Sequence, residues 1–277
     1  MLFSKTYGRK DIELARALRE KGRGVILDIC DNHFYNPMDL PRYRGFREDL
    51  LSMIALTNQV CCSTPTLAKF VAAEAGLERP PAIVADPVDP ALQSAFPAPQ
   101  PNRPQLLWFG AHGAQNAPCG MEDLLRIAEP LERLSRRWAF ELVVVSNSRW
   151  KFRKLISRLP FPTAYIPWER QAFPGILARA RAVLIPVAPN PFTLSKSSNR
   201  LAAALFSGIP VVADAIPSYL EFAEFASLDD WERGLDAVFQ QRPLALAKAA
   251  RGREYLSQRY LPSHIAASWE KVLAPWT

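Results

Sequence analysis

The chain has 277 residues, of which 49% are hydrophobic and 22% are charged. This composition supplies enough apolar surface for buried cores, so a disordered protein is excluded, and the length suits two domains of ordinary size. The four cysteines include no Cys-x-x-Cys pair, which argues against a zinc or redox motif and favours a reducing cytoplasm. No run is apolar enough to predict a membrane-spanning helix.

The formal net charge of +7 is unevenly distributed along the chain. The first 95 residues carry 12 basic and 12 acidic residues, so the whole excess lies in residues 96–277. A basic half predicts an anionic partner. Nucleic acid, a phosphorylated small molecule and an anionic lipid all meet that requirement, and charge alone does not choose between them.

Before residue 85, short apolar runs alternate with helical patterns. Strands are expected at 2–5, 25–30, 59–63 and 82–86, and helices at 11–21, 45–57 and 65–75. Alternation of this kind predicts a parallel sheet built from βαβ units. Four strands are fewer than a doubly wound domain usually has, so this first domain is expected to be truncated. Either it is naturally small, another chain completes it, or a further amino-terminal segment precedes it.

Residues 85–104 contain six prolines. Each proline removes a hydrogen-bond donor and fixes φ, so this stretch predicts a linker in place of a helix or a central strand. It separates an amino-terminal domain, residues 1–95, from a carboxyl-terminal domain, residues 105–277.

Strands and helices alternate again after the linker. The expected strands are 105–111, 140–147, 163–168, 182–187 and 210–214, the expected helices are 121–137, 171–181 and 198–207, and the end of the chain is helical. Nearly continuous apolar strands indicate sheets that are covered on both faces. The predicted fold class is therefore α/β, with two Rossmann-like, doubly wound domains.

Ligands of open α/β sheets bind beyond the carboxyl ends of the strands. One candidate loop, FGAHG, directly follows the strand at 105–111 and offers Gly110, His112 and Gly113. Small residues at a strand-to-helix turn let phosphate or sugar oxygens approach the backbone, although an ordinary turn would look the same.

A second candidate lies before the helix at 198–207. Serine and asparagine at this position predict a helix N-cap, where free amides and a neighbouring cation make an anion site; a solvated cap is the alternative. The residues are Ser195, Lys196, Ser197, Ser198, Asn199 and Arg200.

A third candidate follows the strand at 25–30. Asp31 and His33 lie where this strand opens into a loop. A carboxylate beside an imidazole can bind a hydroxyl group or act as a base, while an Asx-type turn with a structural histidine fits equally well.

Basic residues concentrate in residues 133–158, with Trp138, Trp150 and Phe152 among them. A solvated face is the common explanation of such a cluster. Interleaved aromatic rings also suit a membrane headgroup surface, which makes peripheral contact with the inner face of a membrane an expectation. Nucleic acid is disfavoured because no nucleic-acid motif accompanies the cluster.

The run KSSNRL at 196–201, followed by GIPVV at 208–212, resembles the donor-site signature of GT-B glycosyltransferases, particularly bacterial glycosyltransferases of the "group 1" type. ILDICDNHF, QVCCSTPTLAKF, AIVADPVD and LLWFGAHG are similar to that family's landmarks in the same order, over residues 4–212. The resemblance implies two facing Rossmann-like domains. A nucleotide-sugar donor would be held mainly by the second domain, and an acceptor would approach the first.

The chain departs from this family pattern at several positions. Many retaining members carry two glutamates eight positions apart, where this chain has Ser195 and Ala203. The Gly-Arg and Lys pair that often grips the diphosphate is replaced near Gly110, where His112 stands. The family's opening strand and glycine-rich loop are not visible before Met1.

The sequence thus predicts sugar transfer from a nucleoside-diphosphate sugar to a hydroxyl acceptor, a glycan or a lipid-linked molecule, in cell-envelope polysaccharide or glycoconjugate synthesis. No metal or other cofactor is required by the residues seen. Lys196, with Arg200 and the 195–199 amides, would stabilise the leaving diphosphate, His112 would contact the donor, and Asp31 or His33 would face the acceptor.

Two other functions fit less well. A non-catalytic GT-B-like protein that binds a sugar nucleotide, a glycan or a partner enzyme is favoured by the missing glutamates and the short first domain. A sugar-nucleotide epimerase would need more carboxylates in its cleft. The exposed edge of a four-stranded sheet also predicts self-association through the first domain, or a mobile amino-terminal segment.

Overall fold

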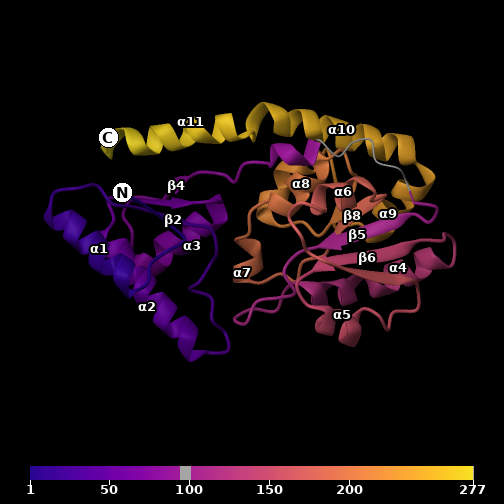
Figure 1. The fold of residues 1–277 in the computed structure, drawn as a ribbon, viewed down its shortest axis with the longest axis horizontal. Helices are drawn as coiled ribbons and strands as arrows, with labels where there is room; N and C mark the ends of the chain where they lie inside the picture. Colours follow the sequence, from indigo (N-terminus) through magenta and orange to yellow (C-terminus); the bar gives the residue numbers. More distant parts are fainter. Residues whose placement is uncertain (94–100, 277) are drawn as a thin grey trace. The chain divides into compact units, whose positions relative to one another are not determined.

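The computed structural model describes residues 1–93 and 101–276, which form two compact units (Figure 1). Unit 1 comprises Met1–Pro87, Asn190–Ser197 and the segment from Pro262 onward, and unit 2 comprises Val88–Pro189 and Ser198–Leu261. Two segments that were expected in the second domain therefore belong to unit 1, which corrects the predicted ranges 1–95 and 105–277.

The described part of the proline-rich stretch is packed, contrary to the expectation of a simple linker. Pro90–Gln93 form a single 3-10 turn, η1, and Leu92 is buried. Val88 is buried too, and its backbone N–H donates to the Tyr260 carbonyl at 2.8 Å. Apolar side chains between the prolines thus fix this part of the stretch to unit 2. Residues 94–100 of the expected linker lie outside the described residues.

Unit 1 contains a parallel four-stranded sheet in the order β1-β2-β3-β4. β1 is an edge strand, as the sequence predicted; self-association through it stays a prediction. The strands and the connecting helices are β1 (Leu2–Ser4), α1 (Arg9–Glu20), β2 (Ile26–Ile29), α2 (Pro41–Leu56), β3 (Gln59–Cys62), α3 (Pro65–Ala75) and β4 (Ala82–Ile83), joined by α7 (Pro191–Leu194) and α11 (Pro262–Leu273).

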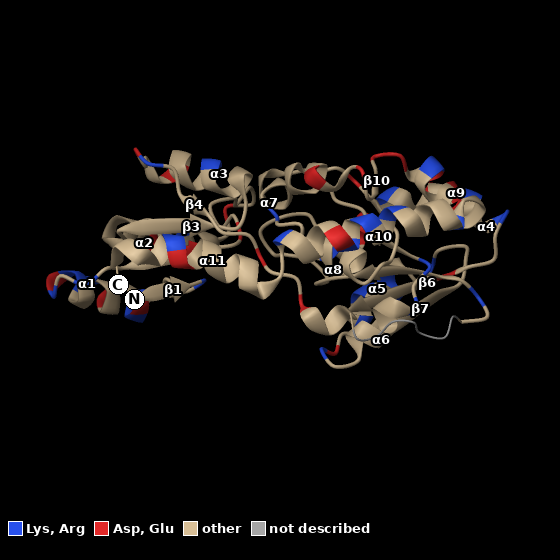
Figure 2. Ribbon diagram, turned by 90° about the horizontal axis from the view of Figure 1, so that it is seen from above, with Lys and Arg blue, Asp and Glu red and all other residues tan. Residues whose placement is uncertain are grey.

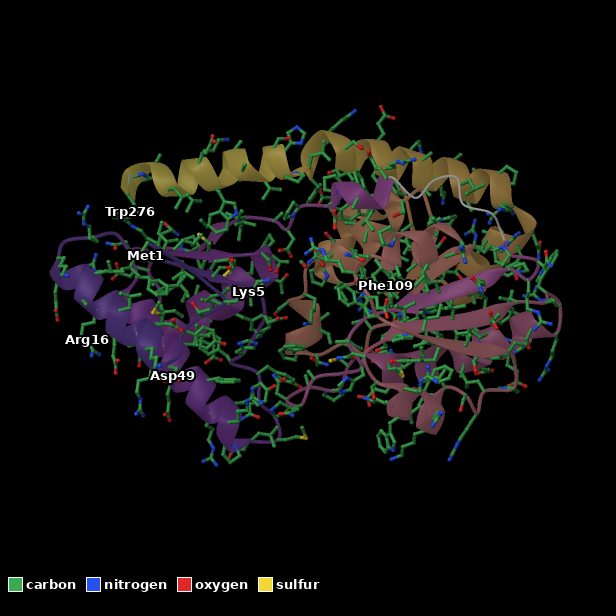
Figure 3. All side chains as sticks on the ribbon, in the orientation of Figure 1. Met1, Lys5, Arg16, Asp49, Phe109 and Trp276 are labelled. Carbon is green, nitrogen blue, oxygen red and sulfur yellow. The ribbon has the colours of Figure 1, made fainter. Side chains whose placement is uncertain are left out.

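Strand order explains why α11 belongs to unit 1. Sequential parallel strands with right-handed connections place α1, α2 and α3 on one face of the sheet, and the buried core of the unit lies under these helices. Figure 1 shows α11 on the opposite side of the sheet. The chain end packs closely there, since a Cβ on Gly24 would lie 3.1 Å from the side chain of Trp276, which is labelled in Figure 3.

Unit 2 contains a parallel six-stranded sheet in the order β10-β9-β8-β5-β6-β7. The chain runs outward from β5 to β7 and then returns to the other side of β5 with β8, so a topological switch point lies between β5 and β8. Its strands are β5 (Gln105–Phe109), β6 (Glu141–Ser146), β7 (Thr163–Pro167), β8 (Ala182–Ile185), β9 (Val211–Ala213) and β10 (Ser227–Leu228).

Helices cover both faces of the unit 2 sheet. Apolar side chains of η2, α4, α5 and α9 pack on one face, while Phe109 of β5 contacts Phe173 of α6 on the other, with ring centroids 4.7 Å apart. The helices are η2 (Met121–Ile127), α4 (Ala128–Ser135), α5 (Arg149–Leu155), α6 (Phe173–Ala178), α8 (Asn199–Phe206), η3 (Pro217–Phe222), α9 (Trp231–Gln240) and α10 (Arg242–Arg259). The predicted α/β class with two parallel sheets is confirmed.

Three local features of unit 2 differ from the sequence expectations. The helix expected at 121–137 begins as the 3-10 helix η2 and becomes α-helical only at Ala128; Pro130, which lacks an N–H, stands in the first turn of α4. α5 and β10 were not expected at all. Among the described residues, no helix is both long and apolar enough to cross a membrane.

Candidate functional site

A pocket of about 250 Å³ opens at the carboxyl ends of β5, β6 and β7 in unit 2. Its lining comes from the end of β5 and from single residues that follow β6 and β7. The lining residues are Phe109, Gly110, Ala111, Asn147 and Trp168. This position beside the switch point is where open α/β sheets bind their ligands.

The loop after β5 is held by donors to its backbone carbonyls. Ser146 Oγ donates to the Gly110 carbonyl at 2.7 Å, and Lys151 Nζ donates to the His112 carbonyl at 3.0 Å. The far end of the loop closes against its beginning at Gly120, whose φ is +99°; a Cβ there would lie 2.7 Å from the Gly113 backbone. Only glycine fits this contact, so the loop has a defined shape.

His112 is oriented by Asn147, the residue directly after β6. The backbone N–H and the ring Nδ1 of His112 both lie 2.9 Å from Asn147 Oδ1. An amide oxygen only accepts, so Nδ1 donates to it, and the exposed side chain leaves Nε2 available to a ligand. His112 was predicted from the sequence, whereas Asn147 was missed, although its place at a strand end was a usable signal.

Arg200 brings a positive charge to the same loop. A Cβ on Gly110 would lie 3.5 Å from Arg200 Nη1, so the guanidinium reaches the end of β5 from the first turn of α8. The fully buried Tyr219 lies behind it: burial raises the pKa of the Tyr219 phenol, and a hydrogen bond with Arg200 acts in the opposite direction. Gly110, His112 and Arg200, predicted at separate places in the sequence, therefore lie on one side of unit 2.

Asp123 is a buried carboxylate beneath this loop that the sequence did not single out. Its oxygens accept from the backbone N–H groups of Gly120 at 2.8 Å and Ala188 at 3.3 Å. Burial raises the pKa of Asp123, and the Arg200 charge lowers it. Asp123 thus links the end of the loop to the segment after β8 and adds a partial counter-charge for Arg200.

The predicted serine cap is wrong in its details. Ser195 is buried, and its hydroxyl donates to the Pro191 carbonyl at 2.7 Å. Ser198 occupies the N-cap position of α8 but makes no side-chain cap bond. A different cap exists eight residues earlier, where Asn190 Oδ1 accepts from the N–H groups of Phe192 and Thr193 at the start of α7.

The unit division runs through the middle of this predicted cluster. Ser195, Lys196 and Ser197 belong to unit 1, and Ser198, Asn199 and Arg200 belong to unit 2. The short helix α7 (Pro191–Leu194) lies within the segment 190–197 that is attached to unit 1. Asn199 is exposed and begins α8.

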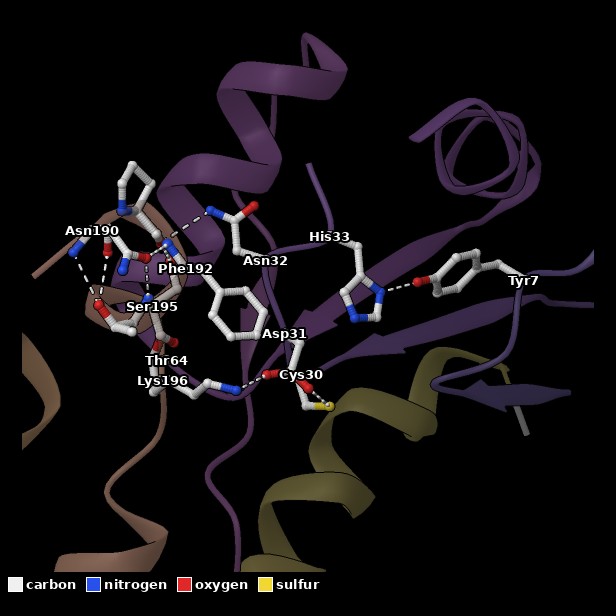
Figure 4. Close-up of polar contacts among 12 residues, drawn as sticks. Tyr7, Cys30, Asp31, Asn32, His33, Thr64, Asn190, Phe192, Ser195 and Lys196 are labelled. Carbon is white, nitrogen blue, oxygen red and sulfur yellow. Dashed lines mark hydrogen bonds and ion pairs between the residues drawn. The ribbon is translucent and has the colours of Figure 1, made fainter. Parts of the chain in front are cut away.

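In unit 1, Lys196 lies at the carboxyl end of β2 (Figure 4). Lys196 Nζ is 2.6 Å from Asp31 Oδ1 and 4.1 Å from the centre of the Phe192 ring. Burial alone would raise the pKa of Asp31, but the Lys196 ammonium outweighs it, so the pKa of Asp31 is lowered. The structure thus joins an expected acceptor-side carboxylate to an expected donor-side cation.

Two further hydrogen bonds attach the segment 190–197 to unit 1. Asn32 Nδ2 donates to the Pro191 carbonyl at 3.2 Å, and Thr64 Oγ1 donates to the Ser195 carbonyl at 2.9 Å. Asn32 and Thr64 are both buried. They follow β2 and β3, so the carboxyl end of this sheet is partly occupied by the chain itself.

His33 lies next to Asp31 and is hydrogen-bonded through Nδ1 to the Tyr7 hydroxyl (Figure 4). Its surroundings favour the neutral ring: burial lowers the pKa of His33, the Asp31 charge raises it, and the Lys196 charge lowers it again. A neutral imidazole can accept a proton. Within residues 1–93 and 101–276, no three His, Cys, Asp or Glu side chains are grouped so that they could hold a metal ion.

No family model and no curated protein matches the sequence. Solved structures do match. HepE from Anabaena, in complex with UDP and glucose, has a TM-score of 0.73 and 14% identity over 99% of this chain and 77% of its own. WaaG, a glycosyltransferase involved in lipopolysaccharide biosynthesis, has a TM-score of 0.69 and 17% identity over 98% and 84%. The chain has the GT-B fold.

A third GT-B structure is an alpha,alpha-trehalose-phosphate synthase (UDP-forming) from Burkholderia vietnamiensis, with a TM-score of 0.66 and 13% identity over 99% of this chain and 73% of its own. Identities of this size show the fold alone. They confirm the fold that the sequence motifs implied. The two residues that stand at the family's glutamate positions have different surroundings. Ser195 is buried, and its hydroxyl donates to the Pro191 carbonyl, whereas Ala203 lies in α8.

Proposed function

We propose that this protein transfers a sugar from a nucleoside-diphosphate sugar to the hydroxyl group of a glycan or lipid-linked acceptor, in cell-envelope polysaccharide or glycoconjugate synthesis. The observation that carries the proposal is the unit 2 pocket, where the Trp168 side chain, the loop at Gly110 and the Arg200 guanidinium adjoin. The UDP and glucose bound to HepE, which is similar in fold, support a uridine nucleotide as the first donor to test.

Each part of the pocket suits one part of such a donor. The Trp168 side chain is 51% exposed, so its ring is available to a nucleobase. The loop from Gly110 to Gly113 gives the diphosphate access to backbone amides, and Arg200 supplies positive charge. His112 Nε2 is placed to accept a hydrogen bond from a sugar hydroxyl.

In the proposed reaction, the bond between the anomeric carbon and the diphosphate oxygen breaks while the acceptor oxygen bonds to that carbon and loses its proton. Negative charge develops on the leaving diphosphate, and a guanidinium fixed beside it lowers the barrier. His33 and Asp31 on unit 1 are the proposed acceptor-side residues. The neutral ring of His33 can accept a proton from an acceptor hydroxyl that is bound on unit 1.

We propose a role for Lys196 that differs from the stabilisation of the leaving diphosphate that the sequence suggested. Its ammonium is engaged with Asp31 at 2.6 Å, so we assign the diphosphate charge to Arg200 and a positioning role on Asp31 to Lys196. The two assignments differ in a measurable way. If Lys196 were the phosphate ligand, its removal would weaken diphosphate binding selectively.

Calorimetry with UDP and uridine tests the donor site. Arg200→Ala is expected to weaken UDP binding about 10- to 100-fold, the value of a charge-assisted contact, and to leave uridine binding nearly unchanged. Trp168→Ala is expected to weaken both ligands equally. Arg136→Ala, which removes an exposed ion-paired arginine elsewhere on unit 2, is the control. Equal loss of UDP and uridine in Arg200→Ala would refute the assignment.

Turnover requires a second measurement. Release of free nucleoside diphosphate is followed across a panel of donors, with and without cell-envelope acceptors. Tight UDP binding without acceptor-dependent release would support a non-catalytic binding protein, the alternative favoured by Ser195 and Ala203 at the glutamate positions. Absence of both binding and release would refute the proposed function.

A further inference from the structure

The structure divides the predicted basic cluster at 133–158 into two unlike halves. The first half, on and after α4, is neutralised by carboxylates. Arg136 pairs with Glu132 at 2.8 Å, and the other pairs are Arg133 with Glu129 and Glu232, and Arg137 with Asp236. This half is an ordinary solvated face with balanced charge.

The second half, α5 and the residues that follow it, carries uncompensated charge. Between Glu141 and Glu169 the sequence has five basic residues and no acidic one. Lys151 pairs with Glu122 at 3.1 Å. The remaining four form no ion pair with a carboxylate of the described residues, and they are Arg149, Arg153, Lys154 and Arg158.

An exposed tryptophan stands among these four side chains. Trp150 is 69% exposed, which is the largest exposed fraction of any large apolar residue in the described part of the chain. Lys154 Nζ lies 5.0 Å from the centre of its ring. The surface therefore combines an exposed aromatic ring with exposed cations. We refer to Arg149, Trp150, Arg153, Lys154 and Arg158 as the α5 surface.

The α5 surface is rigidly supported from within unit 2. Phe152 is buried and packs in the core of the unit, and its ring contacts Tyr165 of β7 at 5.4 Å. Ser148 caps the helix by accepting from the Lys151 N–H at 3.2 Å. Since Phe152 faces inward, Trp150, Arg153 and Lys154 are left on the solvent side.

The helices α1 and α9 lack this pattern, and Figure 2 shows blue and red residues intermixed on both. The helix α10 is also mainly basic, but its sequence contains no tryptophan. Mixed charge is expected of faces that meet only water. A face of one sign with an exposed tryptophan is a different design, because a like-charged surface attracts an anionic partner.

We propose that the α5 surface docks on a lipid bilayer that contains anionic lipids. Tryptophan is favoured at the level of lipid headgroups, where its apolar ring and its N–H are both satisfied, and lysine and arginine near it are attracted to anionic lipids. Each such basic residue strengthens binding about 5-fold. A single ring on a seven-residue helix offers no series of stacking platforms, which disfavours a nucleic-acid strand.

Vesicle co-sedimentation without nucleotide tests this proposal separately from the proposed enzymatic function. Vesicles of phosphatidylcholine alone are compared with vesicles that also contain phosphatidylglycerol. The protein is expected to sediment only with the latter, and less as salt is added. Arg153→Glu/Lys154→Glu is expected to weaken binding at least about 20-fold. Trp150→Ala is expected to weaken it while leaving the salt dependence unchanged.

A matched control separates the surface from the overall charge. Lys10→Glu/Arg16→Glu changes two exposed basic residues of α1 and lowers the net charge by the same amount. It is expected to bind vesicles like the unmodified protein. Thermal unfolding of all variants verifies that each one is folded.

Three results would overturn the proposal. Absence of sedimentation of the unmodified protein with phosphatidylglycerol vesicles would show that the charge serves only solubility. Equal loss in both double variants would show attraction by overall charge alone. Tighter binding to a single-stranded oligonucleotide than to phosphatidylglycerol vesicles would identify a different class of partner.

Discussion

Replacing Lys196 by methionine is expected to destabilise unit 1, because it leaves the Asp31 carboxylate without its counter-ion. The two charged atoms lie 2.6 Å apart, and the side chains are 40% and 32% exposed. Removal of one partner from a fully buried pair costs about 3–5 kcal/mol, while exposed pairs contribute about 0–1 kcal/mol. Solvent screens this half-exposed pair, so we expect a loss of about 1–2 kcal/mol in the free energy of unfolding.

A double-mutant cycle isolates the contact itself. Asp31→Asn removes the carboxylate charge and is expected to cost less than Lys196→Met, since a neutral amide leaves no unpaired charge. The coupling energy between the two substitutions is expected to be about 1 kcal/mol. Urea unfolding gives the free energies, and hydrogen exchange of the β2 amides shows whether the loss is in unit 1. Lys151→Met, which removes an ion-paired lysine of unit 2, is the control.

The pH dependence provides an independent measurement. The pKa of Asp31 is lowered in the folded protein, so the contribution of the pair is fully present above the unfolded value of about 3.9 and is lost as the pH falls through the folded value. Lys196→Met should remove this acid loss. Additive free energies in the cycle, with an unchanged acid loss, would refute the idea that the pair holds the segment 190–197.

Two further substitutions test other parts of the structure. Gly120→Ala places a Cβ 2.7 Å from the Gly113 backbone at a φ of +99°, so UDP affinity is expected to fall at least about 10-fold in calorimetry. Gly45→Ala is the control, because its Cβ meets open space on α2. It should leave UDP affinity unchanged and raise stability slightly. Unaltered UDP binding in Gly120→Ala would separate the loop from the donor site. Burial lowers the pKa of His33 in the folded protein. As the pH falls below about 6.5, the unfolded chain therefore binds a proton at His33 before the folded protein does, and stability should fall. In His33→Gln, the urea midpoint is expected to change less with pH below about 6.5. An unchanged pH profile would contradict the lowered pKa of His33.

All strands except the two-residue β10 were predictable, because most of them are nearly continuous apolar runs between turns. The stretch VILDIC and the strand β2 at Ile26–Ile29 are an example, and α3 has the expected bounds Pro65–Ala75. α5 was not predicted because residues 149–155 are mostly basic and were interpreted as part of a charged cluster and not as a helix. Its apolar side, Phe152 and Leu155, was a weaker signal over seven residues.

The candidate site was predictable where it depends on strand ends, and not where it depends on tertiary packing. Gly110 and His112 follow β5 directly, so their location at the edge of the sheet was foreseeable. Whether Lys196 or Arg200 reaches that edge depends on the α7 turn between β8 and α8. The start of α7 has a sequence signal, Asn190 followed by Pro191, but four residues are too few for an apolar periodicity, so the direction in which α7 sends Lys196 toward Asp31 was not predictable.

The way in which the chain alternates between the two units constrains how the protein can be made and divided. Unit 1 is assembled from three separate stretches, and its hydrogen bond from Asn32 to Pro191 and its ion pair from Lys196 to Asp31 close loops of 159 and 165 residues. During synthesis, the first 87 residues emerge without these partners and without α11, so unit 1 is completed last although it begins first. A cut in the proline-rich stretch would therefore not release two folded halves. It would leave the amino-terminal piece with one face of its sheet uncovered, and the other piece with two orphaned segments.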